Sequence, residues 1–108
     1  MNQERTKGHV LLLLQPAGEK TRTYSDFDSI LAAVEGLCSI FEETYKKENK
    51  VQDVEYEIHD VIGFFENFDE VLLFVYHDGL CHYLPRDFDW IRERLEEFGL
   101  DSSRVTCP

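Results

Sequence analysis

The side chains best suited to binding a metal lie close together near residue 80. His77, Cys81 and His82 provide two imidazoles and a thiol, which are ligand types that zinc prefers. On a hairpin, however, successive side chains point to opposite faces, so Cys81 points away from His82. No fourth ligand follows at a suitable spacing. We therefore predict that the protein holds no metal and no other cofactor.

The sequence also lacks the patterns typical of an active site. It contains no glycine-rich phosphate loop, no nucleophile elbow and no HExxH motif. Its carboxylates are expected to form solvated faces rather than a close pair that could share a proton. We predict a non-catalytic protein. The alternative is a small-ligand-binding or enzymatic α+β domain, because such folds host many activities.

One hydroxyl side chain is a candidate for phosphorylation. Thr23 is followed three residues later by Asp26, which fits the acid-directed pattern of casein-kinase sites. A phosphate at Thr23 would change the local charge. The same two residues can instead form a capping box at the start of a helix. We expect the capping box, and we retain phosphorylation as the functional hypothesis.

Composition and charge narrow the possible partners. The 108 residues suffice for one domain, and 11 basic against 22 acidic residues give a formal net charge of −11. Phosphate groups attract lysine and arginine, so we expect no direct contact with nucleic acid and regard basic protein segments as more natural partners. No apolar run approaches the ~20 residues that cross a membrane. Three scattered cysteines indicate a reducing compartment, so we expect an intracellular protein of the nucleus or cytoplasm.

Hydrophobic periodicity predicts alternating strands and helices. A helix should begin at the capping box and continue to Tyr45, and Pro85 and Asp87 should open a last helix that ends near Gly99. The remaining predicted elements are strands at 9–15, 54–58, 71–77 and 80–84 and a helix at 59–67. The order is β-α-β-α-β-β-α, an α+β sandwich of one sheet and one helical layer. We expect a single domain at 8–99 with flexible ends at 1–7 and 100–108.

Two of the predicted strands are apolar on both faces. Val10–Leu14 and Val71–Tyr76 are unbroken apolar runs, whereas a strand with one wet face would alternate. The candidate helices can cover only one face of such a sheet. We therefore predict that a second copy of the chain covers the other face, which makes a homodimer.

The turn at Asp78-Gly79 determines which side chains share that second face. With a two-residue turn, Phe74 pairs with Tyr83 and Tyr76 pairs with Cys81. Aromatic side chains with hydroxyl groups are enriched at interfaces. The predicted dimer interface consists of Leu11, Leu13, Phe74, Tyr76 and Tyr83. The opposite assignment remains open, because a shift of one residue exchanges the two faces.

A second surface is predicted on the first helix, away from its apolar stripe. Glycine in a helix interior costs ~1 kcal/mol relative to alanine, and a smooth groove that docks a peptide or helix would explain its use. The groove residues are Ser29, Ala33, Gly36 and Ile40. The alternative is a featureless solvated surface. Trp90, opposite the apolar face of the last helix, either seals a neighbouring loop or anchors a partner.

An ordered series of residues resembles the enhancer of rudimentary family from about Gly8 to Phe98. The matching segments are His9–Pro16, Arg22–Tyr24, Glu35–Cys38, Val75–Tyr76, Tyr83 and Asp89–Ile91. The resemblance implies a four-stranded antiparallel sheet with three helices on one face. It also implies a homodimer through the bare sheet faces, a pseudo-barrel with Leu11, Leu13 and Tyr83 in the contact.

The resemblance further implies a non-enzymatic adaptor that binds short segments of RNA-processing proteins. The functions it suggests are splicing, microRNA maturation and elimination of selected transcripts. The sequence departs from the family at Asp101–Pro108, which replaces a basic extension. It also departs at Glu55 and Glu57, which make the predicted second strand more acidic. Ala32 also stands at the position where a second phosphorylation site at Ser29 would need an acidic residue. These departures favour a specialised paralogue, and a nematode paralogue in small-RNA biogenesis is one interpretation.

Overall fold

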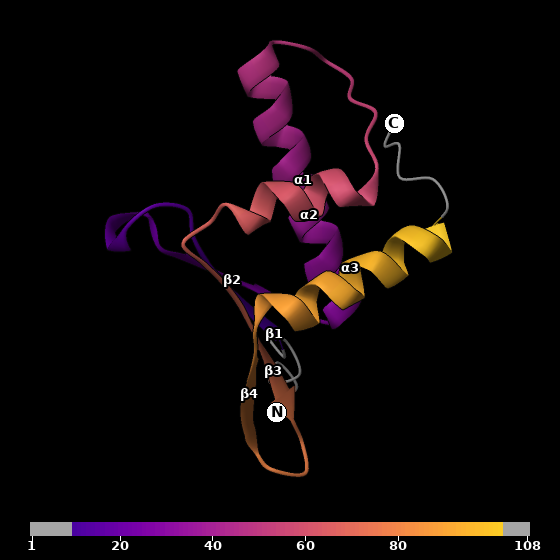
Figure 1. Cartoon of the computed structure of the whole chain (residues 1–108). Coiled ribbons are helices and arrows are strands. Elements are labelled where there is room, and N and C mark those ends of the chain that lie inside the picture. The colour runs from indigo at the N-terminus through magenta and orange to yellow at the C-terminus, as the bar shows by residue number, and fades with distance from the viewer. Residues whose placement is uncertain (1–9, 103–108) are drawn as a thin grey trace.

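The computed structural model describes residues 10–102. Its four strands form one antiparallel sheet in the order β2-β1-β3-β4 (Figure 1). This result confirms the predicted α+β class with a four-stranded antiparallel sheet and three helices. The elements are β1 (Val10–Gln15), the 3-10 turn η2 (Glu19–Thr21), β2 (Thr23–Phe27), α1 (Ile30–Asn49), α2 (Ile58–Glu66), β3 (Glu70–His77), β4 (His82–Arg86) and α3 (Phe88–Ser102).

The three helices pack against one face of the sheet. Every second side chain of β1 and β3 enters a common core with them, namely Val10, Leu12, Leu14, Val71 and Leu73. Each helix contributes side chains that are at most 1% exposed, such as Leu37 of α1, Phe65 of α2 and Leu95 of α3. Each of these buried side chains stabilises the fold by roughly 1.5–3 kcal/mol. The parity predicted for β1 is therefore confirmed.

The predicted order of elements was wrong at residues 23–27, which form strand β2 and not the start of a helix. β2 pairs with β1 along its length, with Leu13 opposite Tyr24. The tight connection between them uses Gly18 at φ +81° and is fastened by the Thr21 hydroxyl, which donates to the Gly18 carbonyl at 2.8 Å. Helix α1 begins later, where the Ser29 hydroxyl oxygen accepts from the Ala32 amide at 3.0 Å. Pairing with β1 satisfies the backbone of this segment, so Thr23 caps no helix.

The predicted strand at 54–58 was also wrong. Residues 54–57 connect α1 to α2 outside the four-stranded sheet, and Ile58 is the first residue of α2. Val54 and Tyr56 are buried in the core, whereas Glu55 and Glu57 are exposed. The alternation in the sequence therefore arises from a connecting segment that packs one side against the core. Glu57 then caps α2 in a capping box with Asp60. The helix predicted at 59–67 is confirmed.

The β3–β4 hairpin projects beyond the helices and has a longer turn than predicted (Figure 1). Residues Asp78–Cys81 form the turn, and Tyr76 opposes Tyr83. The strand register thus differs by two residues from the predicted one. Because side chains alternate with a period of two, the predicted face assignment of these strands survives the change.

The last helix begins at Phe88 and continues past Gly99 to Ser102, so Gly99 is not a C-terminal cap and Pro85 belongs to β4. Gly99 lies where α3 passes close to α2. A Cβ at Gly99 would stand 2.9 Å from both Cβ and Cγ2 of Ile58. The glycine therefore permits close helix packing. The predicted flexible ends are 1–7 and 100–108. Residues 100–102 belong to α3, and the rest of both ends lies outside the described residues.

Candidate protein interfaces

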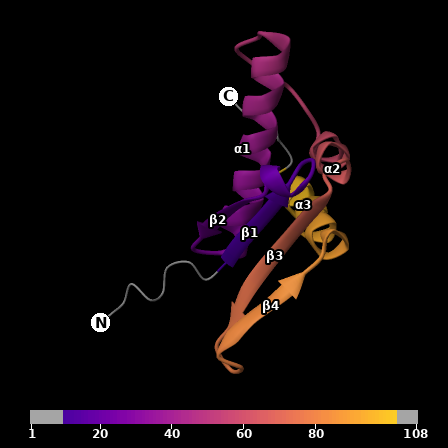
Figure 2. The ribbon, with the colours of Figure 1, turned by 90° about the vertical axis from the view of Figure 1, so that its left-hand side faces the viewer.

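The sheet face that points away from the helices carries a continuous set of apolar and aromatic side chains. Residues directly opposed in an antiparallel pair share a face, and the pairing places Leu13 beside Tyr24 and Leu72, and Phe74 beside Leu11 and Pro85. We call this surface the open face; it consists of Leu11, Leu13, Tyr24, Leu72, Phe74, Tyr76, Tyr83 and Pro85. Figure 2 shows β1, β3 and β4 with no helix drawn in front of them.

Much of the open face is accessible to a partner. Tyr24 is 61% exposed and Tyr83 is 40% exposed, while Leu11 and Phe74 are half-buried. Leu13 does not belong to the core cluster. It is nevertheless only 6% exposed, because its neighbours on β2 and β3 cover it. Residues 10–102 of a single chain therefore leave a largely apolar sheet surface uncovered.

Two tyrosines form the aromatic end of the open face on the projecting hairpin. The rings of Tyr76 and Tyr83 meet edge to face, with centroids 5.2 Å apart. Burial raises the pKa of the Tyr76 hydroxyl, and the nearby Cys81 and Asp78 raise it further. The hydroxyl therefore stays protonated at neutral pH and can donate a hydrogen bond. Rigid aromatic side chains with a polar tip suit a protein contact.

Polar groups border the open face. The Gln15 side-chain oxygen accepts from Arg22 Nε at 2.7 Å, and the exposed Asp26 stands opposite Leu11 on β2. An apolar centre inside a polar rim is the usual anatomy of a protein interface. The geometry is suited to burying the sheet against another protein molecule.

The structure places all five predicted interface residues on the open face. The sequence analysis missed Tyr24 because it predicts a helix start at residues 23–26. It missed Pro85 because it expects this proline to open the last helix. Leu72 has the same parity as Phe74 in β3, so the alternation alone could have identified it. Tyr24 extends the face onto the edge strand β2, and Pro85 extends it along β4, where Tyr83 was already predicted.

The four residues predicted to form a groove on α1 do not form one. Ala33 is 0% exposed and belongs to the core, and Ser29 is the N-terminal cap of the helix. A Cβ at Gly36 would stand 2.7 Å from two ring atoms of Phe27, while Ile40 is half-buried against the core. The glycine in α1 is therefore explained by the packing of Phe27 from β2. This prediction was wrong.

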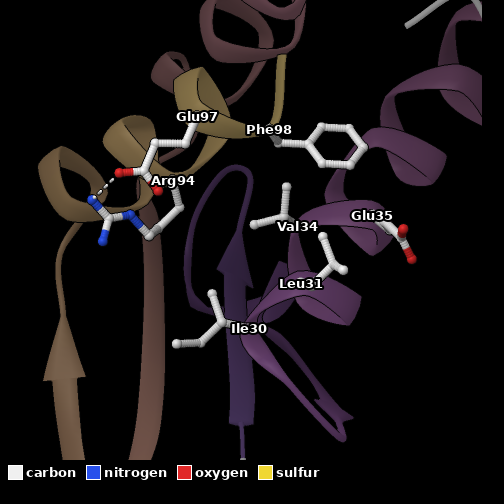
Figure 3. A pocket seen from close by; sticks show the side chains of 7 residues that line it. All are labelled: Ile30, Leu31, Val34, Glu35, Arg94, Glu97 and Phe98. Carbon is white, nitrogen blue, oxygen red and sulfur yellow. Dashed lines mark hydrogen bonds and ion pairs between the residues drawn. The ribbon is translucent and has the colours of Figure 1, made fainter. Parts of the chain in front are cut away.

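A different groove lies between the first half of α1 and the end of α3. It has a volume of ≈ 400 Å³ and is lined by Ile30, Leu31, Val34, Glu35, Arg94, Glu97 and Phe98. Figure 3 shows Ile30, Leu31 and Val34 of α1 across from the α3 residues. Leu31 is 56% exposed, and Arg94 pairs with Glu97 at 3.0 Å on the α3 side. We call this surface the α1–α3 groove, and it offers an apolar floor with charged edges.

The remaining candidate residues also have defined places. Thr23 is exposed on the edge strand β2, opposite Leu14. Trp90 is half-buried against the core, with the guanidinium carbons of Arg86 and Arg94 at 5.2 and 4.8 Å from its ring centroid. The tryptophan is therefore held by contacts within its own chain.

Two further properties concern the described part of the chain alone. Between residues 10 and 102, no three His, Cys, Asp or Glu side chains gather in a way that could hold a metal ion. In the same range, every helix is too short or too polar to cross a membrane.

Comparison with known proteins identifies relatives of this fold. The family described as "ER: Enhancer of rudimentary" matches residues 6–98. The chain is 35% identical over 89 residues to the protein enhancer of rudimentary of Drosophila virilis, covering 81% of this chain and 86% of that protein. It is 31% identical over 96 residues to the enhancer of rudimentary homolog of Arabidopsis thaliana, covering 87% of this chain and 88% of the relative. The homolog of Caenorhabditis elegans is 27% identical over 89 residues, covering 81% of this chain and 86% of the relative. With this match over most of its length, the chain belongs to the enhancer of rudimentary family.

Proposed function

We propose that the protein is a non-catalytic, homodimeric adaptor that binds segments of RNA-processing proteins and scaffolds an RNA-processing or small-RNA biogenesis complex. The observation that carries this proposal is the open face, an apolar and aromatic sheet surface that no described helix covers. The family resemblance supplies the biological context of RNA processing. Such an adaptor acts within the cell, in the nucleus or the cytoplasm.

A second copy of the chain is the simplest cover for the open face, because a twofold axis brings the same residues together from both sides. Full burial of a large apolar side chain is worth roughly 1.5–3 kcal/mol, and about half remains to be gained where the side chain is already partly covered. Leu11, Tyr24, Phe74 and Tyr83 would then contribute roughly 3–6 kcal/mol per copy and roughly 6–12 kcal/mol per dimer. Association costs ~4–15 kcal/mol in lost freedom. Dimerisation is thus energetically feasible once the rest of the face is included.

The α1–α3 groove is the proposed docking place for a partner segment. Its floor of Ile30, Val34 and Phe98 can receive the apolar side of an amphipathic peptide or helix. The edges carry both signs of charge, with Glu35 on α1 and Arg94 on α3. A homodimer presents two such grooves, so two linked partner segments would bind with increased avidity.

The test compares two variants that place the same charge on opposite sides of the molecule. Phe74→Arg puts a guanidinium in the centre of the open face, and Leu31→Arg puts one in the α1–α3 groove. Light scattering measures the mass of each purified protein, and affinity capture from a cell extract followed by mass spectrometry identifies bound proteins.

We expect the native protein and Leu31→Arg to have the mass of a dimer and Phe74→Arg to have the mass of a monomer. Native protein should capture RNA-processing proteins, and Leu31→Arg should lose them while remaining dimeric. A native protein that stays monomeric at high concentration contradicts the dimer. Capture that is unchanged in Leu31→Arg contradicts the groove, and the absence of RNA-processing proteins from the native capture contradicts the adaptor role.

A further inference from the structure

We propose that a second cavity, between α1, α2 and the segment that joins them, binds an arginine side chain from a basic segment of a partner protein. The cavity has a volume of ≈ 410 Å³, within the range of ligand sites. It shares no residue with the open face or the α1–α3 groove, so the site stands independently of the proposed function. We call it the aromatic-acidic cavity; it is lined by Phe41, Tyr45, Val54, Glu55, Tyr56, Asp60, Gly63, Phe64 and Asn67.

Aromatic rings form the walls of this cavity. The Phe41 ring meets Tyr56 at 5.1 Å and Phe64 at 5.5 Å between centroids, in both cases edge to face. Tyr45 lies 6.0 Å from Phe41 and is 41% exposed, so its ring is accessible to an incoming side chain. The faces of aromatic rings carry negative potential and attract cations, and arginine is the cation most often found there.

Acidic groups surround the rings. Glu55 and Asp60 line the cavity and are exposed, and the Tyr56 hydroxyl donates to the Glu42 carboxylate behind it. An adjoining cavity of ≈ 480 Å³ shares Glu55, Tyr56 and Asp60 and adds Glu57 and His59.

Among residues 10–102, no lysine or arginine lines either cavity. His59 lines the adjoining cavity, with Nδ1 3.3 Å from Glu57 and Nε2 3.6 Å from Asp60. The negative potential favours a cationic ligand and repels the phosphates of a nucleic acid. The formal net charge of −11 adds to this preference.

Gly63 keeps the cavity open. It lies inside α2, where glycine is less favourable than alanine. A Cβ at Gly63 would meet no atom within 4 Å, and Gly63 does not have a positive φ. Neither packing nor backbone conformation therefore requires a glycine at this position. Its structural effect is to leave one wall of the cavity without a side chain.

Arginine fits this combination of groups better than lysine does. Its planar guanidinium can stack on a ring and donate paired hydrogen bonds to a carboxylate, whereas lysine carries a compact, strongly hydrated charge. The chain contains such an arrangement elsewhere: Arg94 lies over the Trp90 ring at 4.8 Å and pairs with Glu97 at 3.0 Å. The aromatic-acidic cavity offers the same kinds of partner, and none of its described lining residues is an arginine.

The test is an NMR titration of the full ¹⁵N-labelled chain with three capped peptides that differ at one position. The central residue is arginine in the first peptide, lysine in the second and glutamine in the third, with glycine and serine on either side. We expect the arginine peptide to shift the amide signals of Tyr45, Gly63 and Asn67 in a saturable manner. The lysine peptide should bind more weakly, and the glutamine peptide should leave these signals unchanged.

Two pairs of variants connect binding to the cavity. Gly63→Leu fills the open wall, and its control Ser39→Leu adds the same side chain at an exposed position of α1 outside the lining. Glu55→Gln removes a lining charge, and Glu43→Gln removes an exposed charge elsewhere. We expect Gly63→Leu to abolish binding and Glu55→Gln to weaken it about 3- to 10-fold, with both controls unchanged. Amide spectra of the unliganded variants verify that each remains folded.

Several results would overturn the proposal. If the glutamine peptide binds as well as the arginine peptide, the cavity does not recognise a cation. If the lysine peptide binds as tightly, the assignment to arginine is wrong. Undiminished binding to Gly63→Leu places the peptide elsewhere, and equal losses in Glu55→Gln and Glu43→Gln indicate general charge attraction. A concentration-dependent shift of the same amides without peptide, lost in Gly63→Leu, would assign the cavity to a second copy of the chain.

Discussion

Alanine substitutions at Gly63 and Gly99 should change stability in opposite directions. Both glycines lie inside helices, α2 and α3 respectively. At Gly63 a new Cβ enters open space, whereas at Gly99 it would stand 2.9 Å from the Cβ and Cγ2 of Ile58. The Cβ of Ile58 is fixed to the backbone of α2, so a rotation of the side chain cannot relieve that contact. The two helices would have to move apart.

The expected magnitudes follow from two terms. Replacing glycine by alanine in a helix interior stabilises by ~1 kcal/mol, and this gain is common to both positions. Overpacking at Gly99 costs about 1–3 kcal/mol. Gly63→Ala should therefore raise the free energy of unfolding by ~1 kcal/mol, and Gly99→Ala should lower it by about 0–2 kcal/mol. The difference between the two variants, about 1–3 kcal/mol, isolates the close approach of α2 and α3.

The assay is urea-induced unfolding followed by far-UV circular dichroism. All variants are compared at one protein concentration, because association would otherwise alter apparent stability. Gly36→Ala provides an intermediate case, since its Cβ would meet the ring of Phe27 at 2.7 Å, and a ring tip can move more easily than a backbone-bound carbon. If Gly99→Ala is as stable as Gly63→Ala, the helix packing described for α2 and α3 is refuted.

Three further predictions concern the helix cap, the edge strand and the open face. Ser29→Ala should lower the free energy of unfolding by ~1 kcal/mol through loss of the cap, whereas Thr23→Ala should change it by less than about 0.5 kcal/mol; equal losses in thermal unfolding would contradict the assigned start of α1. An acid-directed kinase should add one phosphate that mass spectrometry locates at Thr23 and that is absent from Thr23→Ala; an unmodified Thr23 would remove the site from consideration. Tyr83→Ala should weaken the proposed dimer by roughly 10-fold or more in sedimentation experiments, because the loss occurs twice in a symmetric contact; an unchanged dissociation constant would exclude Tyr83 from the interface.

The open face was predictable because it depends on alternation alone. The five residues assigned to it from the sequence share parity along three strands, and an error of two residues in the β3–β4 register left that parity intact. A one-residue error would have exchanged the faces. The failure at β2 has a different origin. Thr23 and Asp26 match a capping pattern, but pairing of Leu13 with Tyr24 depends on a neighbouring strand that local signals do not include.

The helical glycines show why the rest of the site was not accessible from the sequence. Gly36, Gly63 and Gly99 all lie inside helices, yet an added Cβ would meet Phe27 at Gly36, no atom within 4 Å at Gly63, and Ile58 at Gly99. Periodicity predicts which face of a helix is apolar but not which neighbour lies above each residue. The α1–α3 groove and the aromatic-acidic cavity both depend on such neighbours, so they became visible only with the tertiary arrangement.

The sheet order has a consequence for synthesis of the chain. β1 lies in the interior of the sheet, yet one of its neighbours, β2, follows immediately whereas the other, β3, comes only after two helices. As the chain leaves the ribosome, the β1–β2 hairpin can form early while the second edge of β1 has no strand to pair with. β1 contains four successive leucines, Leu11–Leu14. An apolar strand with an unpaired backbone edge promotes aggregation. Nascent chains that end before β3 should therefore depend on chaperones more than the finished protein does.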